Sequence, residues 1–175
     1  NLLHSIRTLE KGNETIKDLM ESFALYRINE SSEEGLFLKI RQCISKKRSL
    51  SPEVFETLEQ RTLKSGAGIP GTTIALIHGR SELVENSTFS VFQNLTSVKM
   101  LGMDKKTMEV STILFLLTPE VLEDIQLEIV SSISIGLLEE KNVEIYEKGS
   151  EKEIVTLLEN QLKNTLAAIN NRIWR

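Results

Sequence analysis

The sequence predicts an α/β protein in which a small mixed β-sheet is sandwiched by helices. Three observations predict this class. Apolar residues recur at spacings of three and four near both ends of the chain, as they do in amphipathic helices. Short runs rich in β-branched and apolar residues occupy the middle, as they do in strands. The 175 residues are 40% hydrophobic and 26% charged, which is the composition of an ordinary folded domain.

Helices are predicted for the first third of the chain. Asn13 can cap a helix whose apolar positions continue to Tyr26. A second helix has its apolar face from Leu36 to Ile44. Ser51-Pro52 predicts the start of a third helix, because Ser is a favourable N-cap and Pro suits the first helical position.

The start of the chain bears on its domain organisation. It begins at Asn1 without Met or a signal-peptide pattern, so we expect a piece of a longer protein. The length suits one domain with a substantial core and a helical appendage. We therefore interpret residues 1–30 as a linker helix from an upstream domain and residues 31–175 as the domain itself.

The middle of the chain predicts four strands, over residues 72–77, 88–92, 98–101 and 110–117. The last of these is almost continuously apolar, which is typical of a central strand covered on both faces. Together with the flanking helices, these strands give helices packed over a small sheet.

The last third of the chain again predicts helices. Thr118-Pro119 resembles an N-cap followed by a first-turn proline, so we expect a helix there with apolar positions every four residues to Leu137. Ser150 and Glu153 have the spacing of a capping box. The helix that follows carries its apolar face to Ile169.

Composition also excludes several functional classes. The net charge is −4, so the chain has no surplus of cations with which to bind DNA or RNA. No apolar run approaches the roughly 18 residues that a membrane span requires. One Cys cannot form an internal disulfide, and two His with one Cys are a poor supply of ligands for a metal such as zinc.

Residues Gly66 to Gly71 match the spacing G-x-G-x-x-G. A dinucleotide-binding loop needs a strand before it and a helix after it, whereas here the predicted helix precedes and the predicted strand follows. Pro70 also removes one of the N–H groups that such a loop uses to bind phosphate. We interpret the segment as a tight connection between a helix and a strand.

His78 is the main candidate for chemistry. It follows the apolar run 74–77, where we expect a buried strand to emerge into a turn made possible by Gly79. Arg80 is two residues further on, and Arg61 ends the preceding helix. A neutral imidazole flanked by guanidinium groups can attack a phosphoryl group, whose oxygens the guanidiniums then bind. The alternative of a structural or surface histidine stays open on these residues alone.

Two other reactive side chains are weaker candidates. His4 lies among apolar residues of the N-terminal segment, and we expect a partly exposed helix residue without company. Cys43 has cations nearby at Arg41 and Lys46, which could lower the pKa of its thiol. It has no neighbouring base in the sequence, so we interpret it as a buried helical cysteine.

Three blocks of the sequence resemble the mannitol/fructose type of enzyme IIA domain from the sugar phosphotransferase system. They are Leu58–Leu63, Gly66–Ile69 and Ile74–Gly79, and the whole resemblance extends over roughly residues 32–168. That family shows an Arg late in a helix, a glycine-rich loop and a strand that ends in His-Gly. The resemblance implies an α/β fold and a histidine that is phosphorylated.

Residue roles follow from this resemblance. It implies that His78 is the phosphoacceptor and that Arg61 and Arg80 stabilise the phosphoryl group. Thr72 and Thr73 are weaker candidates to donate hydroxyl or N–H groups to it. The resemblance implies no metal and no cofactor.

Parts of the sequence look closer to a regulatory branch of the family, the C-terminal domains of transcriptional activators and antiterminators of the mannitol-operon-activator type. Residues 68–81 carry much of this likeness. Transport domains have Pro directly before the phosphorylated His, where this chain has Ile77, and usually an acidic residue where it has Thr62. They also carry a second His in the region where this chain offers Asp124.

These departures suit a domain that is phosphorylated as a signal. The resemblance implies a cytoplasmic phosphoacceptor domain of a sugar-responsive bacterial transcription regulator, with phospho-HPr as donor and a IIB domain, in cis or trans, or a second copy as further partners. Two alternatives stay open. One is a transport enzyme IIA subunit that passes phosphate to a IIB domain. The other is a non-catalytic dimerisation or docking domain, so enzyme status is also open.

Overall fold

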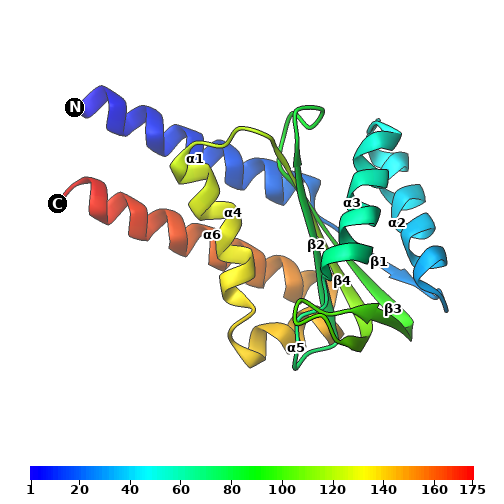
Figure 1. Cartoon of the computed structure of the whole chain (residues 1–175). Coiled ribbons are helices and arrows are strands. Elements are labelled where there is room, and N and C mark those ends of the chain that lie inside the picture. Colours follow the sequence, from blue (N-terminus) through cyan, green and yellow to red (C-terminus); the bar gives the residue numbers. More distant parts are fainter.

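The computed structural model describes all 175 residues and shows one open sheet with helices on both faces (Figure 1). The sheet has four strands in the order β1-β3-β4-β2. β1 runs parallel to β3, β2 runs parallel to β4, and the central pair β3 and β4 is antiparallel, so the sheet is mixed as predicted. The strands are β1 (Ala24–Ile28), β2 (Ile74–Ser81), β3 (Thr88–Leu101) and β4 (Thr107–Pro119).

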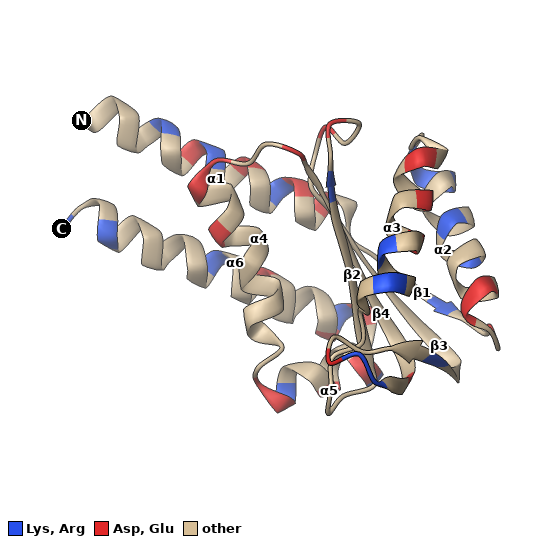
Figure 2. Ribbon diagram, in the orientation of Figure 1, with Lys and Arg blue, Asp and Glu red and all other residues tan.

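Two layers of helices enclose this sheet, which confirms the predicted α/β class. One face carries α2 (Glu33–Lys47) and α3 (Pro52–Ser65). The other carries α1 (Leu2–Ser22), α4 (Asp124–Gly136), α5 (Glu140–Lys148) and α6 (Glu151–Ile173). Acidic and basic residues are interspersed along the helices (Figure 2). No helix is both long enough and apolar enough to cross a membrane.

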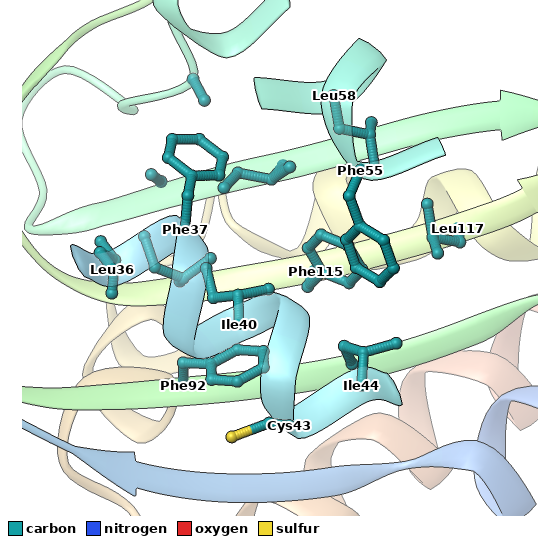
Figure 3. Close-up of a cluster of buried hydrophobic side chains, with 14 of the residues drawn as sticks. Leu36, Phe37, Ile40, Cys43, Ile44, Phe55, Leu58, Phe92, Phe115 and Leu117 are labelled. Carbon is teal, nitrogen blue, oxygen red and sulfur yellow. The ribbon is translucent and has the colours of Figure 1, made fainter. Parts of the chain in front are cut away.

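Aromatic rings fill the core between the sheet and the α2/α3 layer (Figure 3). Phe115 of β4 stacks on Phe55 of α3 with ring centroids 6.3 Å apart, and Phe92 of β3 meets it edge-on at 6.5 Å. Truncating a buried Phe to Ala typically costs about 3–5 kcal/mol, so these rings fix α3 on the sheet. The position of α3 matters because this helix carries Arg61.

The core on the other face includes α1. Leu19 is fully buried there, and a Cβ placed on Gly12 would come within 2.9 Å of both Ile125 and Leu166. The backbone of α1 therefore lies tightly against α4 and α6. The division at residue 30 stays a prediction, but residues on both sides of it share this core.

The predicted N-terminal helix was wrong at both ends. Asn13 does not cap it, because α1 begins at Leu2 after the cap Asn1 and Asn13 lies within the helix. It stops at Ser22, and the residues from Ala24 to Ile28 form β1 instead of continuing to Tyr26 as helix. Phe23 leaves the helical region with ψ of 135°. The hydroxyl of Ser22 accepts a hydrogen bond from the N–H of Phe89 in β3, so tertiary pairing decides the outcome.

The predicted helix start at Thr118-Pro119 was also wrong. Both residues belong to β4, where they pair with Arg80 and Ser81 of β2. Proline is tolerated at the end of a strand, where its missing N–H removes little of the ladder. The helix begins five residues later, after a capping box formed by Glu123 and Gln126.

Strands predicted over 88–92 and 98–101 are one strand, β3, with an irregularity in its pairing between Gln93 and Val98. The side chain of Asn94 bonds both the N–H and the carbonyl of Glu30 there. The pattern therefore indicated a break in the strand pairing and not the end of a strand.

Several predicted boundaries are confirmed. α2 and α3 occupy the predicted positions, and Ser51 caps α3 ahead of Pro52. Ser150 and Glu153 form the predicted capping box of α6. The short helix α5 was not predicted, because nine residues give too few turns for a clear apolar period.

Candidate functional site

The carboxyl ends of the parallel strands β2 and β4 lie side by side and form one edge of the molecule. His78 pairs with Leu116, and Arg80 pairs with Thr118. Alternation along a strand places His78 and Arg80 on the face that carries α4. A pocket of about 180 Å³ opens there between the strand ends and α4, and His78 and Arg80 line it.

Gly79 does not form the turn predicted after His78, because β2 continues to Ser81. Gly79 instead leaves space for a side chain of α3 beside the strand. A Cβ on Gly79 would lie 2.4 Å from Cδ2 of Leu58, so any larger residue would displace the Leu58 side chain that packs here from α3.

This packing of α3 brings Arg61 to the edge of the sheet. Its Nη1 atom lies 3.9 Å from the position that a Cβ on Gly79 would occupy. Arg61 and Arg80 both line a second hollow of about 280 Å³ on the α3 side. Both side chains are exposed and neither belongs to an ion pair. The structure therefore brings the two arginines to His78 from opposite faces of β2.

Local electrostatics favour the neutral form of His78. Partial burial of the ring lowers the pKa of His78, and the charges of Arg61 and Arg80 lower it further. Neither ring nitrogen has a hydrogen-bond partner within the chain, and the side chain is exposed. A neutral, accessible imidazole beside two unpaired guanidinium groups can act as a nucleophile toward an anionic phosphoryl group.

The structure does not bring Thr72 and Thr73 to this site. They precede β2, five or six residues from His78, which is about 16–20 Å along an extended chain. The Thr72 hydroxyl donates to the carbonyl of Ile69 and accepts from the N–H of Ile74. Thr73 binds the carboxylate of Glu147 through its N–H and its hydroxyl. Both threonines are held in a turn at the opposite end of the strand.

The glycine-rich loop is a structural connection, as predicted. Gly66 ends α3 with φ of +85°, a backbone conformation that favours glycine. The N–H groups of Ala67 and Gly68 both donate to the carbonyl of Leu101. These N–H groups are used within the chain and are not turned toward a phosphate.

The weaker candidates lie elsewhere. Cys43 is buried on α2, and burial raises the pKa of its thiol, so it is a poor nucleophile. His4 is an exposed residue of α1. Asp124 lines a hollow against α1 with Arg7 and Lys11 rather than the His78 pocket. No group of His, Cys, Asp and Glu side chains is arranged to hold a metal ion.

Comparison with known families decides what this site belongs to. The family model of the phosphoenolpyruvate-dependent sugar phosphotransferase system, EIIA 2, matches residues 19–161. The chain belongs to this family. The resemblance of this EIIA domain to the mannitol/fructose type is thereby confirmed. No curated protein sequence matches the chain.

Solved structures agree with the family. Nitrogen regulatory protein IIA-Ntr from Neisseria meningitidis is 25% identical, with a TM-score of 0.64 over 82% of this chain and 97% of that one. Enzyme IIA of the mannitol system from Escherichia coli, in complex with phosphorylated enzyme IIB, is 17% identical, with a TM-score of 0.59 over 80% and 95%. The crystal structure of the same mannitol domain gives 19% and 0.55 over 79% and 96%. The mannitol structures support the fold.

The structure adds hydroxyl groups that sequence reasoning missed. Thr118 at the end of β4 and Ser131 and Ser134 on α4 line the pocket of the EIIA domain that contains His78. Thr118 was misread as a helix cap. The serines became relevant only once α4 was placed over β2, because nothing in their local sequence indicates a partner on a strand more than fifty residues away.

Proposed function

We propose that this EIIA domain accepts a phosphoryl group on His78 and reports sugar supply within a bacterial transcription regulator, with phospho-HPr as the donor. The observation that carries the proposal is the exposed imidazole of His78 beside the unpaired guanidiniums of Arg61 and Arg80. A site of this composition needs neither metal nor cofactor, because transfer between two imidazoles is catalysed by positioning and by stabilising charge.

The proposed reaction is an in-line transfer between two histidines. The lone pair of a neutral ring nitrogen of His78 attacks phosphorus, and a new N–P bond forms as the N–P bond of the donor breaks. The electron pair of the broken bond stays on the donor imidazole. Arg61 and Arg80 stabilise the negative charge on the phosphoryl oxygens during the transfer.

The surroundings of His78 provide a surface for a protein donor. The N–H of Glu120 donates to the carbonyl of Ser81, so the loops that follow β2 and β4 lie side by side at the site. These loops expose Leu83 and Val121, at 50% and 84%. Exposed apolar side chains around an arginine-flanked site suit a transient protein partner. HPr is the proposed donor, and a IIB domain is a second proposed partner.

The regulatory role rests on what accompanies His78. Arg80 is the one other ionisable side chain that lines the His78 pocket. Asp124 lines a separate hollow against α1. The pocket therefore lacks a further acid or base to assist onward transfer. The likeness to a protein named as nitrogen regulatory agrees with a signalling role.

Labelling with phosphoenolpyruvate, enzyme I and HPr tests the phosphoacceptor. We expect the wild-type domain to acquire an acid-labile, base-stable phosphate and His78→Ala to acquire none. The matched control is His4→Ala, which alters the other histidine and should label normally. Undiminished labelling of His78→Ala would overturn the assignment.

A second measurement separates signalling from transport. The labelled domain is mixed with a IIB domain of the mannitol type, and the appearance of phosphate on IIB is followed. We expect slow transfer in comparison with a transport enzyme IIA. Rapid, complete transfer would instead favour the transport function.

A further inference from the structure

Thr118 is a polar residue of the pocket that contains His78. It is 4% exposed, it lines the His78 pocket, and its hydroxyl makes no hydrogen bond within the chain. One buried side-chain polar atom of the chain lacks a partner, and it is an oxygen of Glu33, so the Thr118 hydroxyl is not sealed in the core and is open to the pocket. A hydroxyl that is open to the pocket and unpaired within the chain can donate to a group that enters the pocket.

Strand pairing places the Thr118 side chain on the His78 side of the sheet. Thr118 pairs with Arg80 and is on the same face of the sheet as His78, two residue pairs beyond the His78–Leu116 pair. Residues offset in this way lie roughly 8 Å apart at Cα, from a strand spacing of about 4.8 Å and a rise of about 3.3 Å per residue. A phosphoryl group on the His78 ring extends the reach of that side chain toward Thr118.

Ser131 approaches the same space from α4. It is half-buried, it lines the pocket, and its hydroxyl makes no hydrogen bond within the chain. Ser134 differs, because it is exposed and its hydroxyl donates to the carbonyl of Ser131. The pocket thus holds two free hydroxyls, on Thr118 and Ser131, and one that is already used.

We infer that the hydroxyls of Thr118 and Ser131 donate hydrogen bonds to the phosphoryl oxygens on phosphorylated His78. This inference rests on the proposed function. The two hydroxyls bind from the α4 side, while Arg61 and Arg80 bind from the strand edge and the α3 side. Three phosphoryl oxygens offer enough acceptors for both sets of donors. The hydroxyls thereby stabilise the phosphorylated state without adding a group that titrates near neutral pH.

The test is the partition of phosphate between HPr and the domain at equilibrium, measured with radiolabelled phosphate. A hydrogen bond to a charged group contributes enough that Thr118→Val should shift the partition toward phospho-HPr by about tenfold. Thr118→Ser keeps the hydroxyl and should restore it. Ser131→Ala should shift it in the same direction, and the phosphorus NMR resonance of phosphohistidine should move in both variants.

Two matched controls isolate the effect. Thr112→Val removes a buried hydroxyl from the same face of β4 that lines no part of the pocket. Ser134→Ala removes the hydroxyl that already donates within α4. Both should partition like the wild type. A Thr118→Val variant that folds and partitions like Thr112→Val, while the wild type is labelled, would overturn this inference alone. A wild-type domain that acquires no phosphate would overturn the proposed function and this inference with it.

Discussion

The two ends of β2 differ in how their polar groups are used. At the amino end, the Thr72 hydroxyl donates a hydrogen bond to the carbonyl of Ile69 in the turn. The hydroxyl of Thr73 donates one to the carboxylate of Glu147. At the carboxyl end, His78 and Arg80 point to the same face and have no hydrogen-bond or ion-pair partner. Polar groups that are satisfied internally hold a fold together, whereas polar groups left free at a strand end are available to a ligand.

Glycines show the same contrast. Gly66 and Gly71 near the amino end have positive φ values, which serve the course of the backbone. Gly79 near the carboxyl end has no such requirement, and it is small so that Leu58 and Arg61 can reach the strand. A glycine beside a catalytic candidate can therefore act through the space it leaves.

The largest expected effect is on the arginines of the carboxyl end. Arg61→Gln removes a charge that stabilises the phosphoryl oxygens, so we expect phosphorylation by phospho-HPr to slow by about 10- to 100-fold. Initial rates of labelling measure this. Lys64→Gln is the matched control, since Lys64 is an exposed cation one turn further along α3. Equal losses in both variants would mean that general charge attraction, rather than the site, explains the rate.

Gly79→Ala should combine lost stability with lost function. The added methyl group would overlap Leu58, and overpacking of this kind costs about 1–3 kcal/mol. Displacement of α3 would also withdraw Arg61, so phosphorylation should slow. Urea denaturation and labelling rates measure the two effects.

Gly71→Ala is the comparison for this variant. Its Cβ would meet nothing within 4 Å, but its φ of +82° makes the substitution strained, by about 1–2 kcal/mol. We expect a loss of stability with normal phosphorylation. A labelling defect in Gly71→Ala as large as that in Gly79→Ala would contradict a site confined to the carboxyl end.

Thr73→Val should lower stability modestly and leave phosphorylation unchanged. The substitution removes the hydroxyl bond to Glu147 and keeps the N–H bond, so we expect a loss of about 1–2 kcal/mol in the free energy of unfolding. Urea denaturation checks the first part and labelling the second. Slower phosphorylation at unchanged stability would show that Thr73 contributes to the phosphoryl site, as predicted from the sequence.

Sequence reasoning succeeded where the signal was local. Ser51-Pro52 and the Ser150–Glu153 pair marked helix starts correctly, because a cap depends on residues within one turn. The apolar run of β4 indicated a central strand, because both faces of such a strand must be buried. The family resemblance, carried by the block around His78, is confirmed by the family match.

It failed where tertiary contacts decide. Thr118-Pro119 has the local form of a helix start, yet pairing with β2 extends the strand through it. Thr72 and Thr73 are close to His78 in sequence, but an extended strand carries each residue about 3.3 Å further away. Thr118 and Ser131 are distant in sequence and line the same pocket. Distance along a strand and proximity across a sheet are both invisible to local patterns.

The smallest expected effect concerns the pH dependence of the carboxyl end. Burial, Arg61 and Arg80 lower the pKa of His78 below its usual value of about 6.5. The unfolded chain therefore binds a proton at this residue before the folded chain does as the pH falls. Proton binding at His78 therefore lowers the free energy of unfolding progressively below pH 6.5, and this loss becomes constant below the lowered pKa.

Two measurements check the direction of the His78 pKa shift and of its effect on stability. In an NMR titration, the His78 resonances should have a midpoint below 6.5, and Arg61→Gln should raise it, because one of the charges that disfavours imidazolium is gone. His78→Asn should remove this part of the pH dependence of stability. A midpoint that falls in Arg61→Gln would show that Arg61 does not act on His78 through its charge. The change in the His78 pKa should be modest, because the side chain is exposed and solvent screens the arginine charges. The same charges should have a large effect on the rate of phosphoryl transfer, because the phosphoryl group is itself negatively charged.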